Sequence, residues 1–370
     1  MVGTQFETRI KAADRGQQAV GKSAFTLTEL LVVITIIAIL AGLITGAAVN
    51  ALNRAKQAAI TLEMQQLGTA IEEFENKYTA FPPNVYSNPE LTSDTERRLN
   101  CSTLLKMLKK VSSRSTEFQK GARVGSGNNN VATILQNGLS PAEALVFWLQ
   151  GFSQDPTRPL SGTDLQVTQV DDNGTTFNRV ITIDSFKPLY DFDRGRLRFS
   201  RGPDGTRRYL TIYRAGGTDP PVQLQLYEYL PANSEQPYVY FDTSRETPQQ
   251  VVDNWDTTEF FYTNPKTGGT IYPFKQVRPN APQDRSEWST PKLQYIDYVE
   301  KGKYQILHCG IDDIWGNFSN DTAAGGVGGT LNMNDRDEIP RLLAPEGPFI
   351  GDIADNLGHF MGGTLEDKQE

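Results

Sequence analysis

The sequence predicts an α+β protein in which one long N-terminal helix packs on a β-rich C-terminal domain that also holds short helices. Three observations predict it. Residues 30–53 contain no charged side chain. Apolar residues then recur at helical spacing as far as Tyr78, and Pro82 and Pro83 follow. Beyond about residue 165, short β-branched and aromatic runs alternate with Pro and Gly, which is typical of strands.

Composition narrows the class of protein. The chain has 370 residues, enough for one large domain or two small ones. It is 38% hydrophobic and 22% charged, which argues against disorder. The net charge of −8 argues against a nucleic-acid partner, because nucleic-acid binding needs a positive surface that displaces counterions.

The first half of the long helix is long enough to cross a bilayer. The run from Leu30 to Val49 supplies 20 mostly apolar residues, which is about the length that a spanning helix needs. A secretory signal peptide would place its small residue after the apolar run, whereas Ala24 precedes it. Four basic residues precede the run and two follow it closely. The positive-inside rule therefore favours a cytoplasmic leader and an exported body.

Residues 24–31, AFTLTELL, resemble the prepilin processing site of type IV pilins and type II secretion pseudopilins. This resemblance implies a type IV pilin-like fold and cleavage by a prepilin peptidase between Ala24 and Phe25. It also implies N-methylation of Phe25, with Lys22 close to the cut on the leader side. The sequence departs from the family's pattern at Ala24, where Gly is usual, and at Thr28, where Ile is frequent.

Glu29 becomes the fifth residue of the mature chain if this cleavage occurs. A lone carboxylate in hydrocarbon costs roughly 2.5–3.5 kcal/mol on insertion scales. In a filament of parallel helices, the N-terminal amine of one copy would pair with Glu29 of its neighbour, which favours assembly and fixes the axial register. Alternatively, Glu29 lies only about 6 Å along the helix from the new terminus and reaches the headgroups.

Gly42 and Gly46 form a GxxxG pattern within the apolar run. Such a pattern permits close contact between helices, and each Gly also weakens the helix by about 1 kcal/mol relative to Ala. Many pilins have Pro near the position of Gly46, so the resemblance implies a segment that loosens on assembly. A chance occurrence of the pattern is the alternative.

Four regions follow from these features: a leader at 1–24, a membrane-spanning helix and filament core at 25–49, the extracytoplasmic half of the helix at 50–81, and a β-rich globular domain at 82–370. The second half of the helix has one apolar stripe that either the domain or a short coiled-coil seam would cover. Its end, residues 63–82, is similar to that of major pseudopilins of type II secretion, and parts of the last 70 residues resemble a subgroup of pseudopilin-like proteins. The stripe consists of Ile60, Met64, Leu67, Ile71, Phe74 and Tyr78.

Further elements are predicted in the domain. Apolar spacing predicts a helix over 96–111, and the capping box Ser140-Pro141-Ala142-Glu143 predicts the start of another. Residues 125–130 are typical of a loop. Strands are predicted at 180–183, 209–213, 222–227, 238–241 and 304–307.

The sequence offers little sign of catalysis. Its two histidines, His308 and His359, have no partner at metal-ligand spacing, and no Walker loop or nucleophile elbow is present, so we do not expect an enzyme.

Major pseudopilins hold calcium in a C-terminal loop, so the resemblance implies calcium as a cofactor, with Asp312, Asp313, Asp335 and Asp337 as ligands. Acidic loops that face water are the alternative. An exported body also permits a disulfide between Cys101 and Cys309, and two free thiols are the alternative.

Taken with the resemblance, the sequence predicts a structural subunit of a type II secretion pseudopilus or a type IV pilus-like filament, most like the major pseudopilin, that serves protein secretion. The expected partners are the prepilin peptidase, other copies of the chain, minor pseudopilins and the inner-membrane secretion platform. The expected location is the inner membrane, with a single span and a periplasmic body. The alternatives are a large minor (tip) pilin, a membrane-anchored binding module that does not polymerise, or an exported enzyme.

Overall fold

The computed structural model divides the chain into two compact units, residues 1–52 and 53–370. The residues that it describes are 26–84, 106–115, 117, 139–162, 168–169, 179–181, 187–202, 205, 207–212, 222–244, 262–263, 270–284, 287–289, 292–315 and 354–365. The loop predicted at 125–130 lies outside these residues. So does the first part of the helix predicted over 96–111, whose residues 106–111 are helical.

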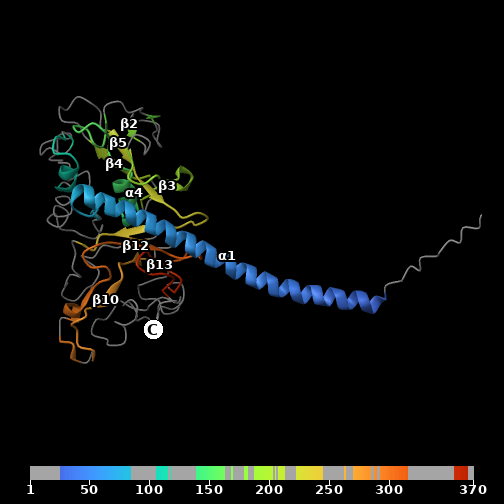
Figure 1. Ribbon diagram of the computed structural model, residues 1–370. Helices are drawn as coiled ribbons and strands as arrows, with labels where there is room; N and C mark the ends of the chain where they lie inside the picture. Colours follow the sequence, from blue (N-terminus) through green and yellow to red (C-terminus); the bar gives the residue numbers. More distant parts are fainter. Residues whose placement is uncertain are drawn as a thin grey trace, which may run out of the picture. The chain divides into compact units, whose positions relative to one another are not determined.

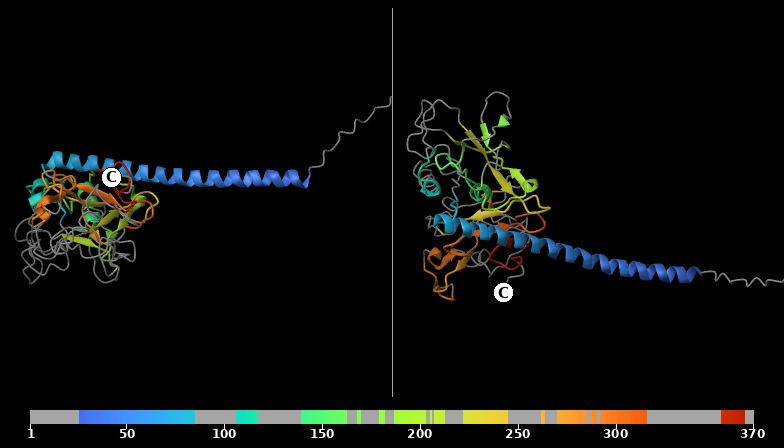
Figure 2. Two further views of the ribbon diagram at one scale, coloured as in Figure 1. Left: turned by 90° about the horizontal axis from the view of Figure 1, so that it is seen from below. Right: turned by 45° about the horizontal axis from the view of Figure 1, so that its top comes forward.

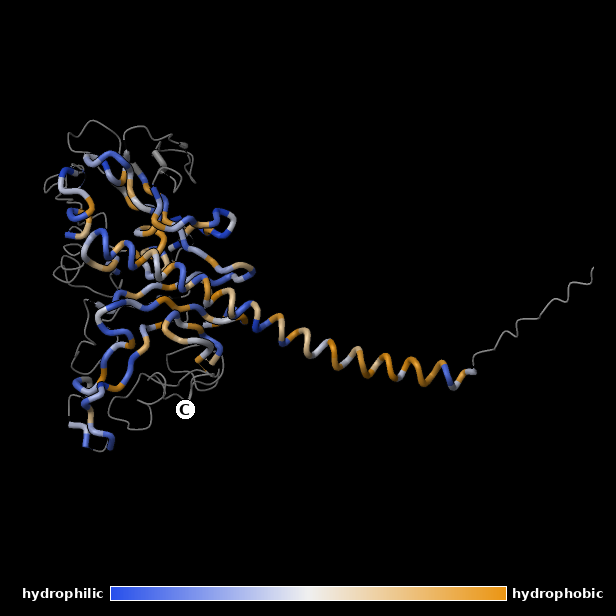
Figure 3. Tube along the Cα trace, in the orientation of Figure 1, coloured by the Kyte–Doolittle hydropathy of each residue, from blue (hydrophilic) through white to orange (hydrophobic). Residues whose placement is uncertain are grey.

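The long N-terminal helix is confirmed. α1 (Leu27–Tyr78) is one uninterrupted helix of 52 residues, and it ends at the last residue of the predicted apolar stripe. It ends where Thr79 takes a φ of 56°, with Pro82 three residues further on. Within the described part of the chain, α1 holds a stretch long and apolar enough to cross a bilayer. Figure 3 shows that apolar residues dominate the first half of this helix.

In the second unit, the apolar stripe on α1 is covered by the globular domain, which favours domain packing over a bare coiled-coil seam. Met64, Leu67, Ile71 and Phe74 are completely buried. Burial stabilises each such side chain by roughly 1.5–3 kcal/mol. Figures 1 and 2 show this half of α1 lying across the sheet that contains β12 (Gln305–His308).

The helix predicted from the capping box is also confirmed. α4 (Pro141–Leu149) starts at Ser140, whose hydroxyl accepts from the Glu143 amide while the Glu143 carboxylate accepts from the Ser140 amide. All nine residues are buried. Trp148 packs edge-on against Phe74 of α1, with ring centroids 5.6 Å apart, and its Nε1 donates to the Pro83 carbonyl at 3.0 Å. This indole therefore connects α1, α4 and the turn between α1 and the rest of the body.

The strands in the described ranges form five small sheets. A four-stranded sheet has the order β1 (Thr168–Gln169), β2 (Arg179–Ile181), β5 (Val222–Gln225), β4 (Tyr209–Ile212). A three-stranded sheet has the order β13 (Leu357–Gly358), β12, β7 (Val239–Phe241). Three two-stranded pairs are β3 (Leu197–Phe199) with β6 (Tyr227–Tyr229), β8 (Tyr262–Thr263) with β9 (Thr270–Ile271), and β10 (Lys275–Val277) with β11 (Ile296–Tyr298).

All five predicted strands are present, and among the strands that the structure describes every pairing except that of β2 with β5 is antiparallel. The run predicted at 222–227 divides at Leu226, whose amide donates to the Arg208 carbonyl, so that β5 and β6 join different sheets. The remaining strands were not predicted, because most have two or three residues. Two 3-10 turns, η2 (Arg194–Arg196) and η4 (Lys292–Tyr295), precede β3 and β11.

Candidate assembly site at the start of the long helix

The first turn of α1 contains a reciprocal cap between Thr26 and Glu29. The Thr26 amide and hydroxyl both donate to Oε2 of Glu29 at 2.8 Å, and the Glu29 amide donates to the Thr26 hydroxyl at 3.2 Å. The carboxylate thus satisfies donors that a helix start leaves unpaired, and it lies where the helix dipole favours negative charge. Glu29 is therefore bonded within its own chain before any neighbour is present.

The two threonine hydroxyls inside the apolar segment that follows this cap have partners within the helix. Every side chain from residue 26 to 52 is exposed, and Leu27 is 79% exposed. The hydroxyls of Thr35 and Thr45 donate to the carbonyls of Val32 and Ala41, both at 2.8 Å. Polar atoms in hydrocarbon need such internal partners, so this surface suits lipid or the apolar face of another helix.

α1 passes through Gly42 and Gly46 without a break. A Cβ added at either glycine would meet no atom within 4 Å. Neither glycine is thus required by packing within the chain. A segment that loosens here on assembly stays a prediction, because it concerns a state with neighbouring copies.

The other residues of the predicted processing site lie outside the described part of the chain. Lys22, Ala24 and Phe25 belong to residues 1–25, and the description begins at Thr26. Cys101 also lies outside it, so the disulfide stays a prediction. Cys309 is a free thiol with no exposed surface.

Two of the four predicted calcium ligands, Asp312 and Asp313, lie within the described residues, and their surroundings differ. Asp313 is held within the body, because its Oδ1 accepts from the Ser234 hydroxyl and, at 3.0 Å, from the Glu235 amide. Asp312 is exposed, and its Oδ1 accepts from the Ile314 amide at 2.8 Å. Asp335 and Asp337 lie outside the described residues.

A carboxylate that sequence reasoning missed lies beside Asp312. Oδ2 of Asp355 accepts from the Ile311 amide at 3.2 Å, whereas its Oδ1 is buried without a hydrogen-bond partner. Burial, and then the charge of Asp312, raise the pKa of Asp355 to about 7. No local pattern indicates this residue as a ligand, because 42 residues separate the two carboxylates along the chain.

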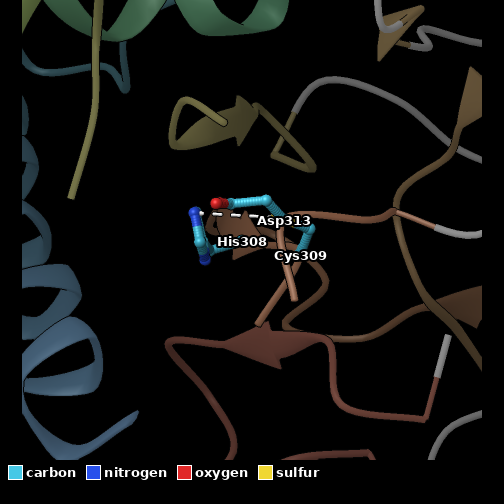
Figure 4. A group of neighbouring side chains, drawn as sticks. All are labelled: His308, Cys309 and Asp313. Atoms are coloured by element: carbon cyan, nitrogen blue, oxygen red, sulfur yellow. Dashed lines mark hydrogen bonds between the residues drawn. The ribbon is translucent and has the colours of Figure 1, made fainter. Parts of the chain in front are cut away.

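His308, Cys309 and Asp313 come together where β12 ends (Figure 4), and their ligand atoms lie within 4.8 Å of one another. Nδ1 of His308 accepts from the Gly310 amide at 3.2 Å, and Nε2 lies 3.2 Å from the Gln236 carbonyl. The proton is therefore on Nε2. A metal on Nε2 would move that proton to Nδ1, where it would face the Gly310 N–H, so this cluster does not suit a metal.

The same hydrogen bonds argue against nucleophilic catalysis by Ser234. Its hydroxyl lies 3.1 Å from Nε2 of His308 and donates to Asp313. A catalytic triad needs a basic Nε2 at the serine and a carboxylate at Nδ1, and this cluster provides neither. Burial lowers the pKa of His308 to about 4, which keeps the imidazole neutral. The cluster is a hydrogen-bonded connection between β12 and the segment before β7.

Comparisons with known proteins bear on the start of the chain. Residues 21–45 match the family model described as the prokaryotic N-terminal methylation motif. No curated protein and no solved structure matches the chain. The N-terminal segment thus has a type IV pilin-like prepilin signal, which implies processing by a prepilin peptidase and pilin-like assembly. Together with the apolar half of α1, this signal fits a membrane-anchored protein whose motif is structural rather than catalytic.

Proposed function

We propose that the chain is a structural subunit of a type II secretion pseudopilus or a type IV pilus-like filament that serves protein secretion. The observation that supports this most directly is the Thr26–Glu29 cap at the start of an uninterrupted apolar helix, inside the methylation motif. The leader would be residues 1–24, the filament core 25–49, the extracytoplasmic part of the helix 50–81 and the body 82–370.

Cleavage between Ala24 and Phe25 would create a positive amine one residue before the cap. In a bundle of parallel helices, that amine would approach Glu29 of a neighbouring copy, which is already held in place by the capping bonds to Thr26. A positioned charge loses less conformational entropy on pairing than a free one. Pairing would also cancel a charge that is costly in hydrocarbon, so the contact would favour assembly and set its axial register.

The membrane and the other partners follow from this role. The leader would be cytoplasmic, α1 would make a single pass through the inner membrane, and the body would be periplasmic. The partners would be the prepilin peptidase, other copies of the chain, minor pseudopilins and the inner-membrane secretion platform. The net charge of −8 does not favour a nucleic-acid partner, and the partly buried arginines at 196, 198 and 208 already pair with carboxylates of the body.

We propose a divalent cation, calcium, as an additional ligand of the body. The hard oxygen donors of Asp312 and Asp355 fit that ion, and the unpartnered Oδ1 of Asp355 is the observation in its favour. Asp313 fits it less well, because its Oδ1 already accepts two hydrogen bonds. A bound calcium would offset the repulsion between the two carboxylates and so stabilise the contact between residues 311–313 and 354–356.

A large minor pilin at the filament tip is the second candidate, and the size of the body, residues 82–370, favours it. Quantification of copies per filament separates the two, because a repeating subunit is present at every axial step and a tip subunit once. A membrane-anchored binding module is distinguished by the variants below, since it would not depend on the charge of Glu29.

Two measurements test the proposal. Mass spectrometry of the protein recovered from cells should find a chain that begins at N-methylated Phe25. Glu29→Gln should prevent filament assembly, because glutamine still completes a capping box but has no charge to pair with an amine. Filaments of normal abundance from Glu29→Gln, or recovery of a chain that begins at Met1, would contradict the proposed function.

A further inference from the structure

Four side chains of the body converge on one carboxylate of α1. Arg196 donates to both oxygens of Glu63, at 2.8 Å to Oε2 and also to Oε1. The hydroxyls of Tyr229 and Tyr238 donate at 2.9 and 2.6 Å, and that of Tyr190 at 3.4 Å. We call Tyr190, Arg196, Tyr229 and Tyr238 the carboxylate cup. The Glu63 side chain is 14% exposed, so a helix residue is nearly enclosed by donors from the body.

The carboxylate cup is rigid because its members pack on one another. The Tyr229 ring has its centroid 6.0 Å from the rings of both Tyr190 and Tyr238, and the guanidinium of Arg196 lies over it at 4.6 Å. Phe192 supports the same ring edge-on at 4.9 Å. The donors therefore hold their directions through ring packing, and the helix supplies the acceptor.

The apolar stripe on α1 cannot by itself define where the helix lies along the body. Its residues are spaced by 4, 3, 4, 3 and 4, so a shift that brings to each position the residue seven places later puts apolar residues on apolar positions again. The opposite shift brings Asn53 and Gln57 to the positions of Ile60 and Met64. Such a shift moves the helix about 10 Å along its axis and rotates it by only about 20°. The stripe would then re-occupy the positions of Ile60, Met64, Leu67 and Ile71.

Glu63 removes this ambiguity. After a seven-residue shift the carboxylate cup would face either Ala70 or Lys56. Ala70 would leave three phenols without their acceptor and remove one of the two carboxylates that pair with Arg196, and Lys56 would place two positive charges together. Both outcomes are unfavourable, so of these three registers only the one that places Glu63 in the carboxylate cup gives its donors an acceptor.

Gly68 restricts the register at a second point. A Cβ at this position would lie 2.8 Å from the hydroxyl oxygen of Tyr304, so a glycine is needed where α1 passes that ring. A seven-residue shift would bring Thr61 or Glu75 there instead. The two points lie five residues apart on α1 and involve different parts of the body.

We propose that Glu63 and the carboxylate cup fix the axial register of α1 on the body. Because the register is fixed, a force along the helix moves the body without slippage of α1. The mechanical part of this inference rests on the proposed function, because only a filament or piston subunit applies such force. The register part depends on contacts within residues 53–370 alone. It is therefore measured on the unassembled chain.

The test measures one distance in the full chain in detergent micelles. Spin labels are placed at Gln66→Cys on α1 and Lys109→Cys on the body, both exposed, with Cys101→Ser and Cys309→Ala in the background. Pulsed electron–electron double resonance should give one narrow distance for the parent. Glu63→Ala should add a second population displaced by up to about 10 Å, the length of seven helical residues. Glu73→Ala, at an exposed acidic residue of the same helix, is the matched control and should keep the parent's distance.

A single, unchanged distance in Glu63→Ala overturns the inference. If that variant does not fold, the exchange Glu63→Arg with Arg196→Glu decides, because it restores a charge pair at the same register. Recovery of the parent's narrow distance supports the inference, and failure of the exchange to recover it counts against it. Neither result affects filament assembly through Glu29, so the two proposals fail separately.

Discussion

Oε2 of Glu29 accepts the backbone amide of Thr26 at 2.8 Å, and the Glu29 amide donates in return to the Thr26 hydroxyl. The acid at the start of the apolar helix thus has a function within its own chain before any filament forms. Its carboxylate accepts a hydrogen bond from a backbone donor that the start of the helix would otherwise leave unpaired. Such an unpaired donor would be as costly in lipid as the charge itself. The same bonds aim the carboxylate toward the end of the chain that processing would expose.

The cap and the charge can be separated by two substitutions. Thr26→Val removes the hydroxyl but leaves the amide and the carboxylate, so we expect a helix start weakened by about 0.5–2 kcal/mol and filaments that still form. Glu29→Gln keeps the cap and should lose filaments. Sedimentation of sheared filaments with immunodetection measures both. If Thr26→Val abolished assembly as completely as Glu29→Gln, the cap rather than the charge would be the essential feature.

A second prediction concerns Ala24, the small residue that precedes the predicted cleavage site. Ala24→Gly should increase the fraction of chains processed at a given time, since a peptidase that usually meets Gly accommodates Ala less readily. Ala24→Leu should leave the leader attached, because a branched side chain does not fit a site made for a small residue. Mass spectrometry of pulse-labelled protein gives the processed fraction. Equal processing of all three chains would place the cut elsewhere.

Sequence patterns predicted the elements that depend on many residues or on one local signature. The prediction of α1 depends on the charge-free run and the stripe from Ile60 to Tyr78, and the prediction of α4 depends on its capping box at Ser140. The Thr26–Glu29 cap was missed, although its spacing, Thr-x-x-Glu, is the same signature. To find this cap from the sequence, residues 26–29 and the charge-free run after them have to be considered together as the start of one helix.

Contacts between distant segments could not be predicted in this way. Glu63 meets Tyr238 across 175 residues, and Asp355 contacts the Ile311 amide across 44. No local pattern distinguishes Glu63 from the exposed acids that follow it on α1. The short strands such as β8 and β10 were missed for a related reason: two or three residues form a strand there because a partner is present, not because of their own propensity.

The buried histidines predict how stability depends on pH. Burial lowers the pKa of both His308 and His359 to about 4, against an ordinary value of 6.5. As the pH falls from 6.5 to 4, the unfolded chain therefore takes up protons that the folded chain does not, and stability is lost in that window. The loss is at most about 3 kcal/mol for each histidine. Denaturant titrations of the full chain in detergent at several pH values measure it.

His308→Gln is the matching variant, since glutamine offers a donor and an acceptor but does not titrate. It should lower stability at pH 7 and remove the contribution of His308 to the loss between pH 6.5 and 4. The raised pKa of Asp355 contributes with the opposite sign over the same window in both proteins. An unchanged slope would mean that His308 is protonated in the folded protein, contrary to its bonds with Gly310 and Gln236.

Calcium should raise the melting temperature of the body if Asp312 and Asp355 bind it. A ligand at 100 times its Kd stabilises the folded state by about 2.7 kcal/mol, which a thermal scan resolves easily. Asp312→Asn should reduce this shift, and Asp193→Asn, at an exposed carboxylate next to η2, serves as the control. Identical melting in calcium and in chelator would remove the proposal.

The close approach of Gly68 to Tyr304 gives a double-mutant cycle. Ala normally favours a helix over Gly by about 1 kcal/mol, but here its Cβ would lie 2.8 Å from the tyrosine hydroxyl oxygen and 3.8 Å from the ring carbon that bears it. Gly68→Ala should therefore destabilise the protein by about 1–3 kcal/mol through overpacking. Tyr304→Phe removes the hydroxyl, so Gly68→Ala in that background should be neutral or stabilising. Equal effects in both backgrounds would show that the hydroxyl is not the obstacle.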